Sequence, residues 1–152
     1  MRALSVKQPW AYAITLGFKP IENRSKPNHA IRGWVLIHAI FPSKAYLTSA
    51  MAQIRAISNG PEALAAMPRT ILHGHIIGAA KIGLTVQNDP SPWFFGPYGY
   101  RVLDAVSFEP RPEFRVPGAL GFWKANSDAK KAAFAVARDL MTNLRPGAEW
   151  AE

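Results

Sequence analysis

Two segments near the start of the chain organise its fold: LSVKQPWA at residues 4–11 and GFKPIENR at residues 17–24. Proline fits the first turn of a helix, and glycine often ends one. We therefore expect a strand over residues 2–6, a helix over 9–16 that ends at Gly17, and a second strand over 20–24.

The rest of the chain alternates short strands with helices. Residues 33–39, GWVLIHA, form a near-continuous apolar run, which is typical of a strand covered on both faces. Ser43 and Ser127 are the expected N-caps of two further helices. The first should stop at Gly60-Pro61, with one more turn over 61–67, and the second should cover about 127–144. Further strands are expected over 71–86 (one bent strand or two paired ones), 100–108, 115–117 and 121–123. Five or six short strands with two or three helices predict an α+β fold, a small β-barrel with the helices packed outside.

The composition describes one globular domain. The chain has 152 residues, of which 49% are hydrophobic and 18% charged, so whole-chain disorder and collagen-like structure are excluded. The absence of cysteine excludes disulfides, zinc–thiolate sites and cysteine nucleophiles. No apolar run is long enough to span a membrane, and the start lacks the apolar stretch of a signal peptide. We therefore expect a cytoplasmic protein with no membrane partner.

The net charge of +8 is concentrated in the N-terminal part of the chain. Up to Pro61 the single acidic residue is Glu22. The basic residues of this part are Arg2, Lys7, Lys19, Arg24, Lys26, Arg32, Lys44 and Arg55. A field of one sign attracts anions, and nucleic acid is the usual anionic macromolecule. The alternative is a basic protein that its charge keeps soluble, and charge alone does not separate the two.

Three segments together carry a family resemblance. They are the two opening motifs, then Arg32-Gly33 with LIHA at 36–39, and then WFFGPYG at 93–99 with Pro117-Gly118 and GFW at 121–123. This pattern resembles the ASCH domain family (activating signal cointegrator homology), a branch of the PUA-like superfamily. The resemblance implies a β-barrel with a cleft and a role in binding RNA or DNA.

Some members of the family are enzymes, including small amidohydrolases that act on acylated cytidine and a ribonuclease. The family's Gly-x-Lys lysine corresponds to Lys19. In the amidohydrolase branch, a hydroxyl nucleophile lies three residues after that lysine, whereas this chain has Glu22 there. A carboxylate cannot form the same acyl intermediate, so the resemblance supports a binding role more than amide hydrolysis.

Lys19, Glu22 and Arg24 form the first group of candidate site residues, at a helix-to-strand turn. Arginine offers a planar fork of donors to phosphate or a base edge, and lysine offers a compact positive charge. Glu22 could accept hydrogen bonds from an exocyclic amine of a base. The alternative is a structural ion pair that stabilises the turn.

A second group of candidates contains further basic and aromatic residues. Lys7, Gln8 and Trp10 surround a helix N-terminus, whose free N–H groups favour an anion, and Lys26 adds a cation. The loop at 93–99 either folds back over the core or presents a platform for stacking bases, with Trp93 and Tyr98 as the expected exposed pair. These residues predict a nucleic-acid partner, single-stranded RNA in particular, that places an unstacked or modified base in a basic, aromatic-lined cleft.

The alternative function is an enzyme in the same cleft. It would be a metal-independent ribonuclease or a small amidohydrolase on modified nucleosides, with Lys19 and Glu22 as catalytic residues. A general base needs a pKa near neutrality, and a nearby carboxylate favours the charged ammonium instead. We therefore expect Lys19 to stay protonated and the domain to bind rather than cleave.

No metal or cofactor is expected. His73 and His75 share a strand face, but no carboxylate lies near them in sequence, and a lone histidine such as His38 in an apolar strand is usually a core residue. Glycine-rich nucleotide-binding motifs and zinc-hydrolase motifs do not occur.

Overall fold

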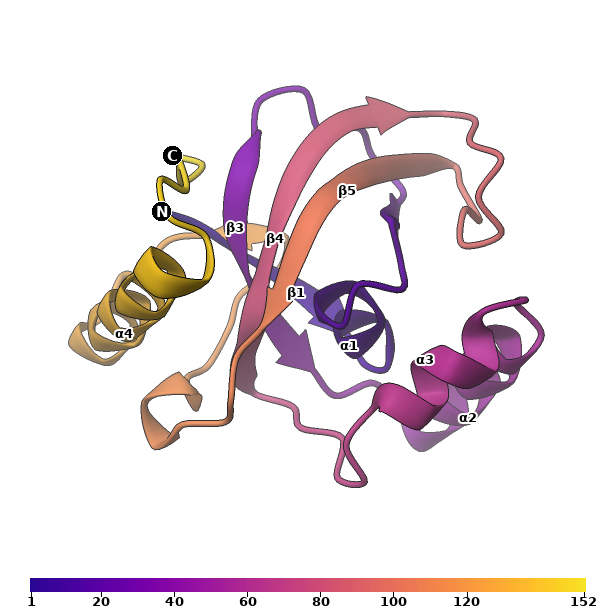
Figure 1. Cartoon of the computed structure of the whole chain (residues 1–152), viewed down its shortest axis with the longest axis horizontal. Coiled ribbons are helices and arrows are strands. Elements are labelled where there is room, and N and C mark those ends of the chain that lie inside the picture. Colours follow the sequence, from indigo (N-terminus) through magenta and orange to yellow (C-terminus); the bar gives the residue numbers. More distant parts are fainter.

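The computed structural model describes all residues from Met1 to Glu152 and has an α+β fold (Figure 1). Its elements are, in chain order, β1 (Ala3–Lys7), α1 (Trp10–Thr15), β2 (Ile21–Arg24), β3 (Gly33–Ile40), α2 (Lys44–Arg55), α3 (Gly60–Ala66), β4 (His75–Val86), β5 (Tyr98–Ser107), a short 3-10 helix (Pro112–Phe114), β6 (Phe122–Trp123) and α4 (Asp128–Leu144). The strands form one six-stranded sheet in the order β2-β5-β4-β3-β1-β6. Only the β1–β3 pair is parallel.

The sheet curls into a half-barrel. Strands β4 and β5 are the longest, and Figure 1 shows both bending over the centre of the molecule. Their pairing shifts register at Lys81/Ile82 and between Ile82 and Thr85, which are the irregularities that let paired strands bend. Strands β2 and β6 end the sheet without pairing with each other, so the barrel is open. The predicted α+β class and strand number are confirmed, and the closed barrel is replaced by this half-barrel.

Strand β3 has a hydrophobic core on each face, as its apolar run predicts. Its Val35 and Ile37 belong to an inner core shared with α1, α2 and α3. Its Trp34 and Leu36 belong to an outer core shared with α4. Since side chains alternate along a strand, a strand buried on both sides needs apolar residues at nearly every position.

Helix α1 lies inside the curl of the sheet, and this corrects the expectation that all helices pack outside (Figure 1). All six of its residues are buried, and it contacts β1, β3, β4 and β5. The small side chains of Ala11 and Ala13 permit the close approach, and Gly78 of β4 leaves room for Thr15. The curl therefore places the start of α1, with Trp10, at the centre of the molecule.

The helix count is four rather than two or three. Ser43 and Ser127 cap α2 and α4 as expected. However, α2 already ends at Arg55, and Gly60-Pro61 begins the separate helix α3, because proline is compatible with the first turn of a helix. None of the helices combines the length and the apolar composition that crossing a bilayer requires.

Two strand boundaries also differ from the prediction. Strand β4 is a single strand that begins at His75 rather than at residue 71. Residues 115–117 form no strand, although Arg115 makes one isolated bridge to His75. A short 3-10 helix, with Pro112 in its first turn, ends at Phe114 directly before Arg115.

We predict that Gly78→Ala lowers the free energy of unfolding by about 1–3 kcal/mol, because overpacking strains a close-packed interior. A Cβ at this position would collide with the backbone carbonyl of Val106 and lie 2.8 Å from Thr15 Cγ2. Gly83→Ala on the same strand is the control, since its new Cβ would meet only the Leu103 side chain, which is exposed and can move. Urea denaturation of the two variants compares them, and equal losses would contradict the close packing of Val106 and Thr15 around Gly78.

Candidate functional site

A cavity of about 360 Å³ opens beside the start of α1. Pockets that hold small molecules typically measure roughly 300–1,000 Å³. Its walls come from β1, α1, β2, the end of β3, α2, the loop before β5 and the loop before β6. The lining residues are Ser5, Val6, Lys7, Trp10, Lys19, Glu22, Asn23, Arg24, Ser25, Ile40, Tyr46, Gln53, Phe95, Leu120 and Gly121. Both opening sequence motifs therefore line the same cavity.

The turn between α1 and β2 brings Lys19 to the cavity. Gly17 has a φ of +87°, a left-handed conformation that glycine adopts without strain and that ends the helix. The backbone N–H groups of Phe18 and Lys19 then donate to the carbonyl of Ala13, which folds the chain back under α1. In β2, the alternation of side chains places Glu22 and Arg24 on the same face.

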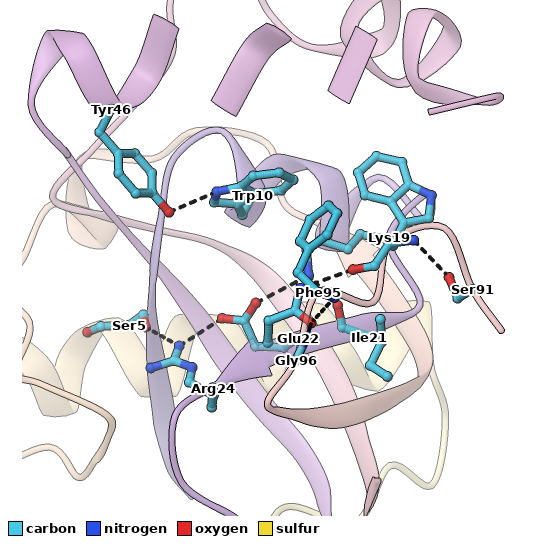
Figure 2. A network of polar contacts seen from close by, with 12 residues as sticks. Ser5, Trp10, Lys19, Ile21, Glu22, Arg24, Tyr46, Ser91, Phe95 and Gly96 are labelled. Carbon is cyan, nitrogen blue, oxygen red and sulfur yellow. Dashed lines mark hydrogen bonds and ion pairs between the residues drawn. The ribbon is translucent and has the colours of Figure 1, made fainter. Parts of the chain in front are cut away.

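The carboxylate of Glu22 is the centre of a polar network (Figure 2). Its Oε1 lies 3.4 Å from Lys19 Nζ, and its Oε2 accepts a 2.9 Å hydrogen bond from Arg24 Nη2. Arg24 Nη2 also donates to the backbone carbonyl of Ser5 at 2.7 Å, and Lys19 Nζ donates to the carbonyl of Ile21. Glu22 thus links the helix-to-strand turn to β2, and Arg24 continues the link to β1.

Burial changes the expected electrostatics of Lys19. Only 1% of its side chain is exposed, and this desolvation lowers the pKa of Lys19 below its usual value of 10.5. The charge of Glu22 and its hydrogen bond act in the opposite direction but are weaker than burial. The effect of Glu22 has the expected direction, but burial outweighs it, because the sequence shows the carboxylate and not the depth of the lysine.

Aromatic side chains form the wall opposite the carboxylate. Trp10 Nε1 donates a 3.0 Å hydrogen bond to the hydroxyl of Tyr46, and the Trp10 ring meets Phe95 edge-on with 5.7 Å between centroids. Lys7 Nζ lies 4.8 Å from the centroid of the Tyr46 ring. Leu120 is 92% exposed at the rim. The cavity therefore combines an apolar wall, a buried anion and cations near its opening.

The loop at 93–99 both packs on the core and presents an aromatic side chain. Trp93 is only 1% exposed, and its Nε1 donates to Asn59 Oδ1 at 3.0 Å. Tyr98 begins β5, pairs with Arg24 and does not line the cavity. The expected exposure of Trp93 is therefore wrong, and Tyr98 is half-buried outside the cavity. Phe95, which is 48% exposed, is the aromatic residue that this loop contributes to the cavity.

Two more of the sequence candidates lie outside the cavity. Gln8 is fully buried, where its side chain donates to the carbonyl of Leu72 and accepts from the N–H of Tyr12. This places Gln8 in the framework of α1 rather than at a binding surface. Lys26 is exposed but does not line the cavity. The predicted residues that the structure does bring together are Lys7, Trp10, Lys19, Glu22 and Arg24.

Sequence reasoning missed Asn23, which shapes the loop. Its Oδ1 accepts hydrogen bonds from the N–H groups of Phe95 at 2.8 Å and Gly96 at 3.3 Å, and its Nδ2 donates to the carbonyl of Trp93 at 3.0 Å. The sequence held one indication of this role, which is the position of Asn23 between Glu22 and Arg24. Alternation along a strand turns the middle residue toward the opposite face. Asn23 thereby couples the motif in β2 to the aromatic loop.

The histidines form no metal site. No group of three or more histidine or carboxylate side chains lies close enough to hold a metal ion. His38 is buried, with its Nε2 2.7 Å from the carbonyl of Val116, and burial lowers its pKa below the usual 6.5. It packs edge-on against Trp123 in the outer core.

No protein-family model matches this chain, and no curated protein has a significantly similar sequence. The interpretation of the cavity therefore depends on its own residues and geometry.

We predict a pH-dependent contribution of Lys19 to stability. Between its lowered pKa in the folded protein and 10.5, the unfolded chain binds more protons at this site, so this residue adds stability as the pH rises through that range. The free energy of unfolding of the wild type, minus that of Lys19→Met, should therefore increase with pH below 10.5. Urea denaturation at a series of pH values measures the difference.

Lys131→Met, at an exposed position of α4, is the control and should show no such increase. A constant or falling difference for Lys19→Met would contradict the effect of burial.

Proposed function

We propose that this chain is an ASCH-type, PUA-like domain that binds single-stranded RNA and takes one unstacked base into the cavity. One observation carries the proposal. Residues of the family-like segments that lie far apart in sequence, including Trp10, Glu22, Phe95 and Gly121, line the same cavity. Recognition of single-stranded RNA typically uses an aromatic platform for the base and polar groups for its edge, and this cavity has both.

The charged residues of the cavity differ in their exposure, and we assign them different roles in binding RNA. Lys7 is exposed at the rim, where it can contact a phosphate and add affinity for any sequence. Glu22 and Lys19 are buried, so they act on a group that enters the cavity. Phe95 offers its exposed ring to a base. A cytoplasmic location, where single-stranded RNA is available, is part of the same proposal.

We predict that Phe95→Ala weakens the binding of a short single-stranded RNA by about 1–3 kcal/mol, the usual cost of losing one stacking side chain. Phe41→Ala is a matched control, because Phe41 is also 48% exposed but lies outside the cavity. Fluorescence anisotropy with a labelled oligonucleotide measures both. Equal effects of the two substitutions would show that the RNA does not use this cavity.

We further predict that binding weakens with salt and that Lys7→Ala makes the dependence less steep. Each phosphate contact on a single strand contributes about −0.7 to the slope of log affinity against log salt concentration. The slope of Lys7→Ala should therefore be smaller in magnitude by about 0.7. Lys131→Ala serves as the control. Affinity that does not change with salt would contradict the role of the basic rim.

A second candidate function is a metal-independent ribonuclease or a small amidohydrolase on modified nucleosides. The observation in its favour is the lowered pKa of Lys19, since an amine that loses its proton more easily is a better general base. Against it, Lys19 Nζ already donates to Ile21 and Glu22, and its side chain is almost inaccessible to a substrate. RNA cleavage that increases with pH and disappears in Lys19→Met would favour the enzyme over the binding domain.

A further inference from the structure

We propose that the cavity selects guanine among the four RNA bases, through the two oxygens of the Glu22 carboxylate. This inference rests on the proposed function, because it names the base that enters the cavity. The two carboxylate oxygens differ in their protein partners: Oε1 faces Lys19 and Oε2 accepts from Arg24. Each carboxylate oxygen can accept two hydrogen bonds, so each keeps one position for a ligand.

The carboxylate has to remain an acceptor on both oxygens. Arg24, which is always charged, donates to it, and no carboxylate of another residue lines the cavity. Figure 2 shows Glu22 between Arg24 and Lys19, with the Trp10 and Tyr46 rings nearby. A ligand that pairs with Glu22 therefore needs two adjacent N–H donors on one edge, and an aromatic face to contact the rings.

Among the neutral bases, guanine alone meets this requirement. Its Watson–Crick edge places the N1–H donor next to the N2 amine, so both oxygens of a carboxylate can accept from it. Cytosine and adenine present one amine next to a ring nitrogen with a lone pair, and uracil presents one N–H between two carbonyl oxygens. Each of these three would turn a lone pair toward a carboxylate oxygen, which leaves a buried acceptor unpaired.

The side chains beside Glu22 on β2, Asn23 and Arg24, are compatible with guanine. The side chain of Asn23 already donates to Trp93 and accepts from Phe95 and Gly96, so it does not compete for the base. Arg24 Nη1 donates to no protein acceptor and lies on the same guanidinium that contacts Glu22, so it can serve the O6 acceptor of guanine.

The charges distinguish a neutral base from a cationic ligand. A guanidinium group, such as an arginine side chain of a peptide, also carries adjacent N–H donors. However, the cavity is lined by three cations, Lys7, Lys19 and Arg24, and by the single carboxylate of Glu22. This excess of positive charge repels a cation and favours a neutral base attached to an anionic backbone.

The test is a set of short uridine oligonucleotides that differ in one central base. With guanine at that position we expect binding that is roughly ten- to a hundredfold tighter than with adenine, cytosine or uracil. This is the usual preference that one bidentate hydrogen-bonded pair gives for the matching base over the other bases. Inosine, which lacks the N2 amine, and 1-methylguanine, which lacks the N1–H, should each lose most of this preference. These ligands test the contact in the unaltered protein.

Glu22→Gln tests the protein side, since an amide offers one acceptor and replaces the other by a donor. We expect it to lose the guanine preference, so that oligonucleotides with guanine, adenine, cytosine or uracil at the central position bind this variant with similar affinity. Asp104→Asn, which changes a carboxylate paired with Arg145 outside the cavity, should retain the preference. If Glu22→Gln does not fold, the binding of the inosine and 1-methylguanine oligonucleotides to the wild-type protein tests guanine selection without it.

The outcomes separate this inference from the proposed function. Equal binding of all four central bases, with the effect of Phe95→Ala intact, would overturn guanine selection and leave RNA binding in place. Unchanged affinity for inosine or 1-methylguanine would also overturn it. A chain that binds no RNA but binds an arginine-containing peptide would overturn both.

Discussion

The carboxylate of Glu22 is the interaction on which the arrangement of the cavity depends. It holds Lys19 from the turn after α1 and Arg24 from the same strand, and Arg24 reaches the backbone of Ser5 in β1. Removing one partner of a buried ion pair typically costs about 3–5 kcal/mol, because the other charge stays buried without compensation. Three segments of backbone are therefore held together by one side chain that also faces the cavity.

A buried ion pair contributes little net stability compared with apolar residues of similar size, because desolvating the charges offsets their attraction. Burial lowers the pKa of Lys19 despite the neighbouring carboxylate, which is the direction that such a desolvation cost predicts. The structure nevertheless retains this polar cluster, and its side chains line the cavity beside α1. A ligand with matching hydrogen bonds is the physical reason that we propose for its position.

The curl of the sheet and the position of α1 make the cavity possible. Small residues at Ala11, Ala13 and Gly78 let the helix approach the strands closely, and Trp10 then stands at the cavity wall. The aromatic loop forms a further wall of the cavity, and Asn23 positions this loop by accepting hydrogen bonds from its backbone N–H groups. The same loop thus uses Trp93 to anchor itself in the core and Phe95 to present a ring to the cavity.

The sequence by itself determined the local elements and the faces of the strands. The apolar run of β3 predicts burial on both sides, and the alternation in β2 places Glu22 and Arg24 together, because both patterns depend only on neighbouring residues. Only the tertiary structure decided which side chains are exposed. The depth of Lys19, the burial of Trp93 and Gln8, and the entry of Tyr46 and Leu120 into the cavity depend on contacts between segments far apart in the chain. Local periodicity does not contain those contacts, so it could not distinguish Phe95 from Trp93.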